Sequence, residues 1–488
     1  MTVGQISTWS SVVVMSNRKI VYIAVLILFG ILVYLLFTQL APDRNGVIVA
    51  SLIQCIAFVI FFFYFGWLNR RMLSLYSIFL LAFYLFQNGR VLMYALNIEY
   101  NYFYINKYGI DIVFQSVKFS TLCLVAAFAA GVFSFGRCKN PGFLKKLNHI
   151  SVSFMKKLAI IMFILSSIVA FPYMVKKYCL CTANGYDAVI EYTASMSSFY
   201  VLMEKLFISF GLLLLIYSKK RDVWCIISYC MIIIWSILAV FAGDRTTGIA
   251  GLTIIALHSF YSSNWRYKKQ GRRVLNSIIL ILAIVSITFL INIAFSYRMQ
   301  TEYQQGSIND AVVGAVGTVG FSFFPLVLTM RICPSVEPFL YGRSMIGGLI
   351  SGLIPKGLDF FGITSVFAEW SSEPTQWIVQ HYDYSFGIDF SLISECYANF
   401  GWYGWIAMFF ICAVIAFMLR NVDYSKSNNK FTQYTGLILL YAWFTLPRRK
   451  SFYVFNNIFW HVFVVGAIIL LAYNVLNSKQ TSYNQGLK

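Results

Sequence analysis

Arginine side chains recur at the ends of long apolar segments, where they could bind an anionic group beside a membrane. The clearest case is FAGDRTTGIAG, in which Asp244 and Arg245 separate two apolar runs. A planar guanidinium donates paired hydrogen bonds that match phosphate oxygens better than a lysine ammonium does. Other cations at outer segment ends are Arg90, Arg298, Arg331, Arg343, Arg448, Arg449 and Lys450.

Each arginine taken alone has a simpler interpretation, in which its side chain reaches the membrane surface and contacts a lipid phosphate. The whole set is harder to explain in that way, because positive charge is disfavoured on the outer side of a membrane. Arg245 is the strongest candidate, since a turn of two or three residues leaves its side chain no room to move away. We therefore predict that Arg245, oriented by Asp244, binds a diphosphate.

Two further side chains could accept a proton on the same side. Glu395 lies where a long loop returns to an apolar segment, and His381 is the one histidine of that loop. Either could act as a general base, with Glu395 as the first choice. Pairing with one of the arginines is the alternative for Glu395. Asp383 and Asp389 lie near His381, but this spacing is unspecific, so no metal site is predicted.

The elements that must position these residues are membrane-spanning helices. Of the 488 residues 59% are hydrophobic and 11% are charged, whereas soluble proteins carry about 25% charged residues. Apolar blocks of about 20 residues are long enough to cross a bilayer as helices, and alternation typical of barrel strands is absent. The sequence predicts an all-α polytopic membrane protein with twelve spans, at 20–40, 47–68, 72–88, 112–136, 158–174, 198–217, 223–242, 246–262, 274–295, 400–419, 431–447 and 453–476.

The distribution of charge orients these spans. With the N-terminus inside, the inner connections hold 23 of the 38 basic residues and 2 of the 18 acidic residues. This asymmetry predicts that both termini are cytoplasmic. It also explains most of the net charge of +20, so nucleic-acid binding is not needed to account for it. No cleavable signal peptide is evident, because the first apolar run is too long.

The spans divide the chain into three predicted parts. Residues 1–295 form an N-terminal bundle of nine spans, 296–399 a large outer loop, and 400–488 a C-terminal bundle of three spans. A loop of this length is usually functional. Its apolar stretch 311–330 could span the membrane, but a helix lying on or dipping into the outer leaflet is the preferred interpretation.

Several common functions lack their motifs. The chain has no Walker sequence, no glycine-rich dinucleotide motif and no His-Glu-x-x-His, so neither ATP nor a cofactor is expected. The ten cysteines are scattered without metal spacing, and we interpret them as structural.

Three segments resemble O-antigen polymerases of the Wzy type. The segment FGIDFSLISECYANFGWYGWIAMFF (386–410) is similar to their signature, with matching residues Gly387, Ser391, Glu395, Tyr397, Asn399, Phe400, Gly401 and Gly404. AGDRTTGIAGL (242–252) resembles a Gly-x-Arg-Thr turn of that family, and YGRSMIGGLISGLIPKGL (341–358) resembles a loop segment. The first 240 residues match in hydropathy alone.

The resemblance implies a reaction at the periplasmic face of a bacterial inner membrane. An acceptor sugar hydroxyl would attack the anomeric carbon of a glycan on undecaprenyl diphosphate, and the lipid diphosphate would leave. Asp244, Asn399 and Tyr397 would contact the donor or acceptor glycan, or would serve packing. Membrane lipids and a polysaccharide chain-length regulator would be further partners. The arrangement of spans also resembles O-antigen ligases, related to C-type glycosyltransferases.

Three alternatives remain at this point. An O-antigen ligase would use the same donor, but the segment around Glu395 favours a polymerase. A flippase for the lipid-linked unit usually has two related halves and short outer loops, and this chain shows neither. A structural envelope protein would not need polar residues concentrated on one side.

Overall fold

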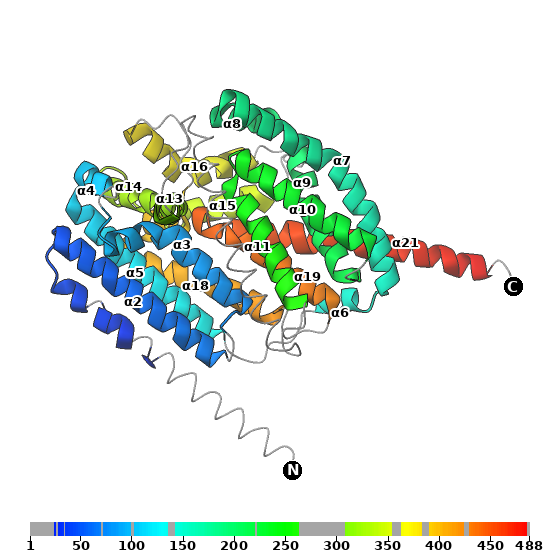
Figure 1. Ribbon diagram of the computed structural model, residues 1–488, viewed down its shortest axis with the longest axis horizontal. Coiled ribbons are helices and arrows are strands. Elements are labelled where there is room, and N and C mark those ends of the chain that lie inside the picture. Colours follow the sequence, from blue (N-terminus) through cyan, green and yellow to red (C-terminus); the bar gives the residue numbers. More distant parts are fainter. Residues whose placement is uncertain are drawn as a thin grey trace, which may run out of the picture.

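The computed structural model describes residues 24–25, 28–33, 35–69, 72–98, 102–134, 142–219, 222–262, 308–353, 363–382, 390–423 and 429–485. Within these ranges every regular element is a helix, so the all-α polytopic fold is confirmed (Figure 1). Nine helices of the described part are long and apolar enough to cross a membrane. The span predicted at 274–295 lies outside the described residues, and so do residues 20–23, 26–27 and 34 of the first predicted span.

Several predicted spans agree closely with helices of the structure. These are α2 (Arg44–Leu68), α5 (Ile110–Phe133), α9 (Ser198–Tyr217) and α10 (Val223–Phe241). Helix α3 (Leu75–Ala95) continues past the end predicted at residue 88, so Arg90 lies within the helix and not beyond it. All five are strongly apolar, and four of them are preceded by a polar side chain that accepts a hydrogen bond from the first turn. Those four residues are Asp43, Ser74, Ser197 and Asp222.

Helix α7 (Val152–Asn184) is longer than its predicted span. Its 33 residues would extend about 50 Å, well beyond a hydrocarbon core of about 30 Å. It ends at Gly185, whose φ of 83° only glycine adopts easily, and α8 (Tyr186–Ser195) follows at once. The chain then returns to the bundle through α9. The C-terminal end of α7 and all of α8 therefore extend beyond the part of the chain that would cross the membrane.

Two predicted spans are short helices inside the bundle. Helices α11 (Arg245–Ser262) and α19 (Lys430–Phe444) have 18 and 15 residues and pack against each other. Protein surrounds α19, which is buried along nearly its whole length. A helix enclosed by other helices need not match the thickness of the lipid, because its neighbours cover its ends.

The C-terminal part contains two interrupted spans. The first joins α17 (Leu392–Phe400), η5 (Gly401–Tyr403) and α18 (Gly404–Asn421). The second joins α20 (Tyr453–Ile458), the π-helix η7 (Phe459–Val464) and α21 (Val465–Gln485). The short turn η6 (Leu446–Arg448) lies between α19 and α20.

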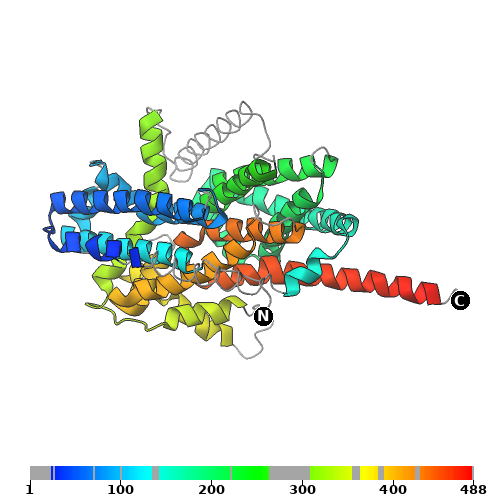
Figure 2. The ribbon, with the colours of Figure 1, turned by 90° about the horizontal axis from the view of Figure 1, so that it is seen from below.

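The described part of the predicted outer loop is also helical. It comprises α13 (Ile308–Val319), η3 (Gly320–Phe323), α14 (Phe324–Ile332), α15 (Arg343–Leu353) and α16 (Ile363–Tyr382). The segment Val313–Ile332 is long and apolar enough to span. In Figure 1, however, α13 is seen nearly end-on while α2, α3 and α5 run across the view, and Figure 2 shows it upright against them. It thus crosses these spans, and its place on the outer leaflet stays a prediction.

A glycine pair permits this crossing. A Cβ atom on Gly320 would lie 2.6 Å from the Cα atom of Gly89 on α3, so neither position has room for a side chain. Helices α4 (Tyr102–Tyr108), α8 and α16 gather at one end of the bundle, and α6 (Gly142–Asn148) lies toward the other (Figure 1). The connections predicted to be outer and inner are therefore separated in space.

Candidate functional site

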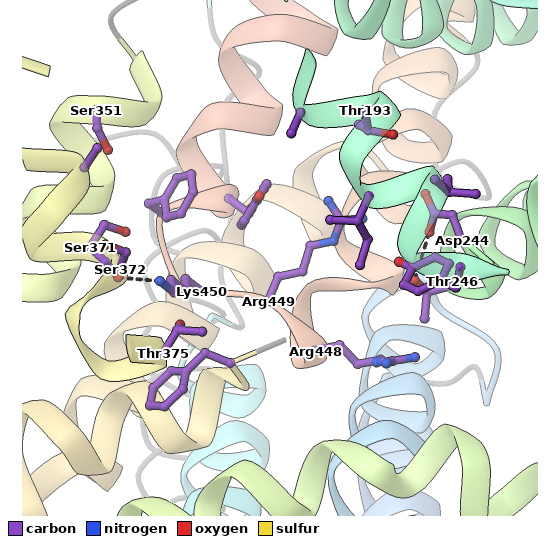
Figure 3. A pocket seen from close by; sticks show the side chains of 18 of the residues that line it. Thr193, Asp244, Thr246, Ser351, Ser371, Ser372, Thr375, Arg448, Arg449 and Lys450 are labelled. Carbon is purple, nitrogen blue, oxygen red and sulfur yellow. Dashed lines mark hydrogen bonds between the residues drawn. The ribbon is translucent and has the colours of Figure 1, made fainter. Parts of the chain in front are cut away.

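A cavity of about 690 Å³ lies at the end of the bundle that carries α8 and α16 (Figure 3). Helices from distant parts of the chain meet there, namely α7, α8, α11, α15, α16 and α20. Its lining residues with ionisable or hydroxyl side chains are Lys177, Tyr186, Thr193, Asp244, Thr246, Ser351, Ser371, Ser372, Thr375, Arg448, Arg449, Lys450 and Tyr453.

One wall is formed by the cation loop, defined here as Pro447–Phe452. It presents Arg448, Arg449 and Lys450 in succession. Figure 3 shows the Arg449 side chain extending into the cavity, with Lys450 turned toward α16. The Lys450 ammonium donates a hydrogen bond to the Ser371 carbonyl of that helix. Three adjacent positive charges without an intervening carboxylate create a strong local preference for an anion.

Arg449 is the central cation of the loop. Its Nη2 atom lies 3.5 Å from Thr247 Oγ1 on α11, and its guanidinium carbon lies 5.1 Å from the centre of the Tyr453 ring. The contact with the ring face favours a cation and limits the directions that the side chain can take. Arg449 is therefore positioned beside α11, and its planar guanidinium can present paired donors to an anion.

Contacts with other helices fix the backbone of the cation loop. Gln87 Nε2 on α3 donates to the Pro447 carbonyl, and Ser451 N donates to Glu395 Oε2 on α17 at 2.5 Å. These anchors lie 360 and 56 residues away along the chain. Long-range contacts, rather than the local turn, set where the three cations point.

The opposite wall begins at the turn between α10 and α11. Asp244 Oδ1 accepts from Thr247 N at 3.3 Å and from the Thr246 hydroxyl at 3.4 Å, which caps the first turn of α11. Gly243 has a φ of 89°, and a Cβ there would lie 2.2 Å from the Tyr186 ring. The half-buried Asp244 is the single carboxylate among the described residues that line the cavity.

Hydroxyl groups cover much of the remaining surface. Ser371, Ser372 and Thr375 come from α16, Ser351 from α15, and Thr193 from α8. Hydroxyls both donate and accept hydrogen bonds, which suits a partner that carries many hydroxyls of its own. Lys177 also lines the cavity, but its ammonium is paired with Glu204 at 3.1 and 3.2 Å.

The arrangement can therefore bind an anion on one wall and polar groups on the others. An anion leaving from a carbon centre would be stabilised by fixed donors on the cation loop. Asp244 could accept a proton from a hydroxyl held between the walls. In the part of the chain that the structure describes, no group of three or more His, Cys, Asp or Glu side chains could hold a metal ion.

The structure describes four of the five predicted arginines, and their positions differ. Arg245 is 7% exposed and lies between two residues that line the cavity, Asp244 and Thr246. Arg90 lies on α3, half-buried. Arg331 is exposed at the end of α14, and Arg298 lies outside the described residues. The four described ones, Arg90, Arg245, Arg331 and Arg343, are not among the lining residues.

Arg343 has a local partner instead. Its Nε atom lies 3.6 Å from Glu373 Oε2, and its guanidinium carbon lies 5.1 Å from the centre of the Trp370 ring. The predicted base His381 is similarly occupied, since its Nε2 atom lies 3.2 Å from Glu337 Oε1. The first pair joins α15 to α16, and the second joins α16 to the segment between α14 and α15. None of these four residues is among those that line the cavity.

The three predicted residues of α17 are buried behind the cavity. Glu395 and Asn399 are 0% exposed and Tyr397 is 5% exposed. Asn399 Nδ2 donates to Ser344 Oγ at 2.7 Å, and its Oδ1 accepts from Gly342 N at 2.9 Å. The Tyr397 ring packs edge-on against aromatic neighbours, among them Phe119, Phe339 and Trp402. For Asn399 and Tyr397 these contacts favour packing over a role with the glycan.

Sequence reasoning missed most of the lining. The run Arg448–Lys450 is among the cations at outer segment ends, but it was not predicted to bind the diphosphate, although three consecutive cations on the disfavoured side were a usable signal. The hydroxyls of α16 gave no signal, because Ser and Thr are common in any polar helix.

A family model described as O-antigen polysaccharide polymerase Wzy matches residues 20–481 of the chain. No significant match was found among curated proteins or solved structures. The match covers both walls of the cavity and the whole segment around Glu395.

Proposed function

The chain belongs to the O-antigen polysaccharide polymerase Wzy family, and we propose that its cavity joins oligosaccharide repeat units carried on undecaprenyl diphosphate. Members of this family are polymerases of lipid-linked repeat units in membranes. The protein is an integral membrane protein, and we place it in a bacterial inner membrane with both termini cytoplasmic and the cavity facing the periplasm. The predicted charge asymmetry and the separation of the two sets of connections support this orientation.

The cation loop binds the donor diphosphate in this proposal. Arg448, Arg449 and Lys450 line the cavity side by side, whereas Arg90, Arg245, Arg331 and Arg343, the described arginines of the earlier prediction, do not line it. Arg245 keeps a supporting part, because it is buried between two lining residues and adds positive charge at the edge of the site. The proposal rests on one observation: three cations line one side of the cavity, and a single carboxylate among the described residues, Asp244, lines the opposite side.

The chemical step follows from the two walls. The oxygen of an acceptor sugar hydroxyl forms a bond to the donor's anomeric carbon while the bond from that carbon to the diphosphate oxygen breaks. Undecaprenyl diphosphate leaves with the bonding electron pair, and the cation loop stabilises its charge. The hydroxyl proton passes to Asp244 and from there to water. The hydroxyls of α16, α15 and α8 hold the sugars.

The proposal is tested with the full-length protein in lipid nanodiscs. Lipid-linked repeat units are supplied as sole substrate, and glycan length and free undecaprenyl diphosphate are measured. We expect a ladder of repeat-unit multiples and one equivalent of undecaprenyl diphosphate released for each bond formed. Release without a ladder, or a lack of both with folded protein, would refute the proposal.

Deletion of the gene separates a polymerase from a ligase. A polymerase deletion leaves cells that carry a single repeat unit on their lipid core, because transfer to the core continues. A ligase deletion leaves none. Complementation with the intact chain should restore the full ladder, and glycan gels read both outcomes directly.

A further inference from the structure

Glu395 is a carboxylate buried near the start of the interrupted span that α17 and α18 form. It is 0% exposed, and its Oε2 atom accepts from Ser451 N at 2.5 Å. Its Oε1 atom has no hydrogen-bond partner among the described residues. A buried carboxylate at membrane depth is costly, so a purely space-filling role would be served better by a neutral side chain.

The position of Ser451 shows what this carboxylate can influence. Ser451 lies between Lys450 and Phe452, both of which line the cavity. Lys450 is also close enough for its charge to interact with that of Glu395. The hydrogen bond from Ser451 N thus holds the backbone at the point where the cation loop enters α20. A carboxylate acceptor makes this bond about twice as strong as a neutral one would.

Helix α17 is itself firmly anchored, so it can serve as a reference for the loop. Ser391 caps its first turn by accepting from Ser394 N at 3.3 Å. At its other end Asn399 forms hydrogen bonds with Ser344, which lies within α15, and with Gly342, which precedes α15. Any shift of Ser451 relative to Glu395 would therefore be a shift of the cation loop relative to the cavity.

We propose that Glu395 is a positioning residue that holds the cation loop, through Ser451, in the conformation that binds diphosphate. This inference rests on the proposed function of that loop. It differs from a role as general base, which requires contact with the acceptor hydroxyl. Glu395 is not among the lining residues, and Ser451 separates it from them.

The experiment measures binding of undecaprenyl diphosphate to the full-length protein in nanodiscs, with turnover measured in parallel. We expect Glu395→Ala to weaken binding about tenfold or more, since it removes a charge-assisted hydrogen bond. Glu395→Gln keeps an oxygen acceptor for Ser451 N but loses the charge, so it should weaken binding only about threefold. Both variants should raise KM for the donor by the same factors.

Ser394→Ala is the matched control. Ser394 is also fully buried on α17, but its hydroxyl bonds Ser391 and not the cation loop. Its substitution should lower thermal stability without weakening diphosphate binding. Wild-type binding in Glu395→Ala together with lost turnover would overturn the inference and favour a base. Equal weakening in Ser394→Ala would overturn it in favour of general destabilisation.

Arg449→Ala distinguishes failure of this inference from failure of the proposed function. If Arg449→Ala weakens diphosphate binding and Glu395→Ala does not, only the positioning role is wrong. If Arg449→Ala leaves binding unchanged, the cation loop is not the diphosphate site and both proposals fail.

Discussion

Two hairpins that border the cavity place charged residues between apolar helices, and they are built in opposite ways. The turn Gly243–Thr247 is stabilised by its own residues, because Asp244 caps the helix that follows it. The cation loop is held by α3, α16 and α17, through Gln87, Ser371 and Glu395. The two hairpins meet where Arg449 contacts Thr247.

This difference suggests a division of work. A turn that caps its own helix holds Asp244 in one place whatever happens elsewhere in the bundle. A loop fixed by three other helices holds its cations only when those helices are assembled. We infer that the turn supplies a constant carboxylate, and that the diphosphate side of the site depends on the fold of the whole bundle.

The largest effect is expected for Asp244→Asn. The amide keeps the oxygen that caps α11 but cannot take the proton of the acceptor hydroxyl. We expect kcat to fall about a thousandfold with little change in diphosphate binding. Turnover and undecaprenyl diphosphate binding in nanodiscs would be compared. A variant that polymerises at the normal rate would show that Asp244 serves only the turn.

The next effect is expected for Arg449→Ala, on the other hairpin. Loss of one fixed donor to a leaving anion should lower kcat about a hundredfold and should also weaken diphosphate binding. Arg449→Lys keeps the charge but loses the planar fork and should recover only part of the activity. If the lysine variant were fully active, charge alone would suffice and the paired geometry would be unimportant.

The same contrast explains what the sequence could predict. The Gly-Asp-Arg-Thr turn was recognised because its residues are adjacent and interrupt an apolar run, and most spans were placed within a few residues for the same reason. Glu395 was noticed from its place in a motif, but its partner is Ser451, 56 residues away. The pairing of the Glu395 carboxylate with the Ser451 N–H depends on how the helices pack, and the hydropathy pattern carries no information about packing.

The α13 segment illustrates the same limit. Length and apolar character admit both a span and a helix lying along the membrane. The crossing is permitted by Gly89 and Gly320, which lie on helices far apart in the chain. Each glycine alone is unremarkable in an apolar helix, so their pairing could not be foreseen.

A smaller effect is expected for Gly243→Ala, which tests how rigid the turn is. An alanine would be strained at a φ of 89°, and its Cβ would meet the Tyr186 ring at 2.2 Å. We expect unfolding in detergent to become easier by about 1–3 kcal/mol. Gly109→Ala is the control, because Gly109 has a φ of 94° but open space around it. Equal losses in the two variants would show that the contact with Tyr186 adds nothing.

The smallest effect is expected for Arg343→Ala, an arginine of the predicted outer loop that belongs to neither hairpin. Its pair with Glu373 is long, at 3.6 Å, and the two side chains are 49% and 26% exposed. Such a pair contributes about 0–1 kcal/mol to stability, and a contact with an aromatic ring such as Trp370 adds a similar amount. Glycan ladders from cells that express Arg343→Ala should therefore match the wild type within about twofold in polymer yield, a change no larger than such a weak surface contact produces. A loss as large as that of Arg449→Ala would mean that the diphosphate also contacts α15, so that the site extends beyond the two hairpins.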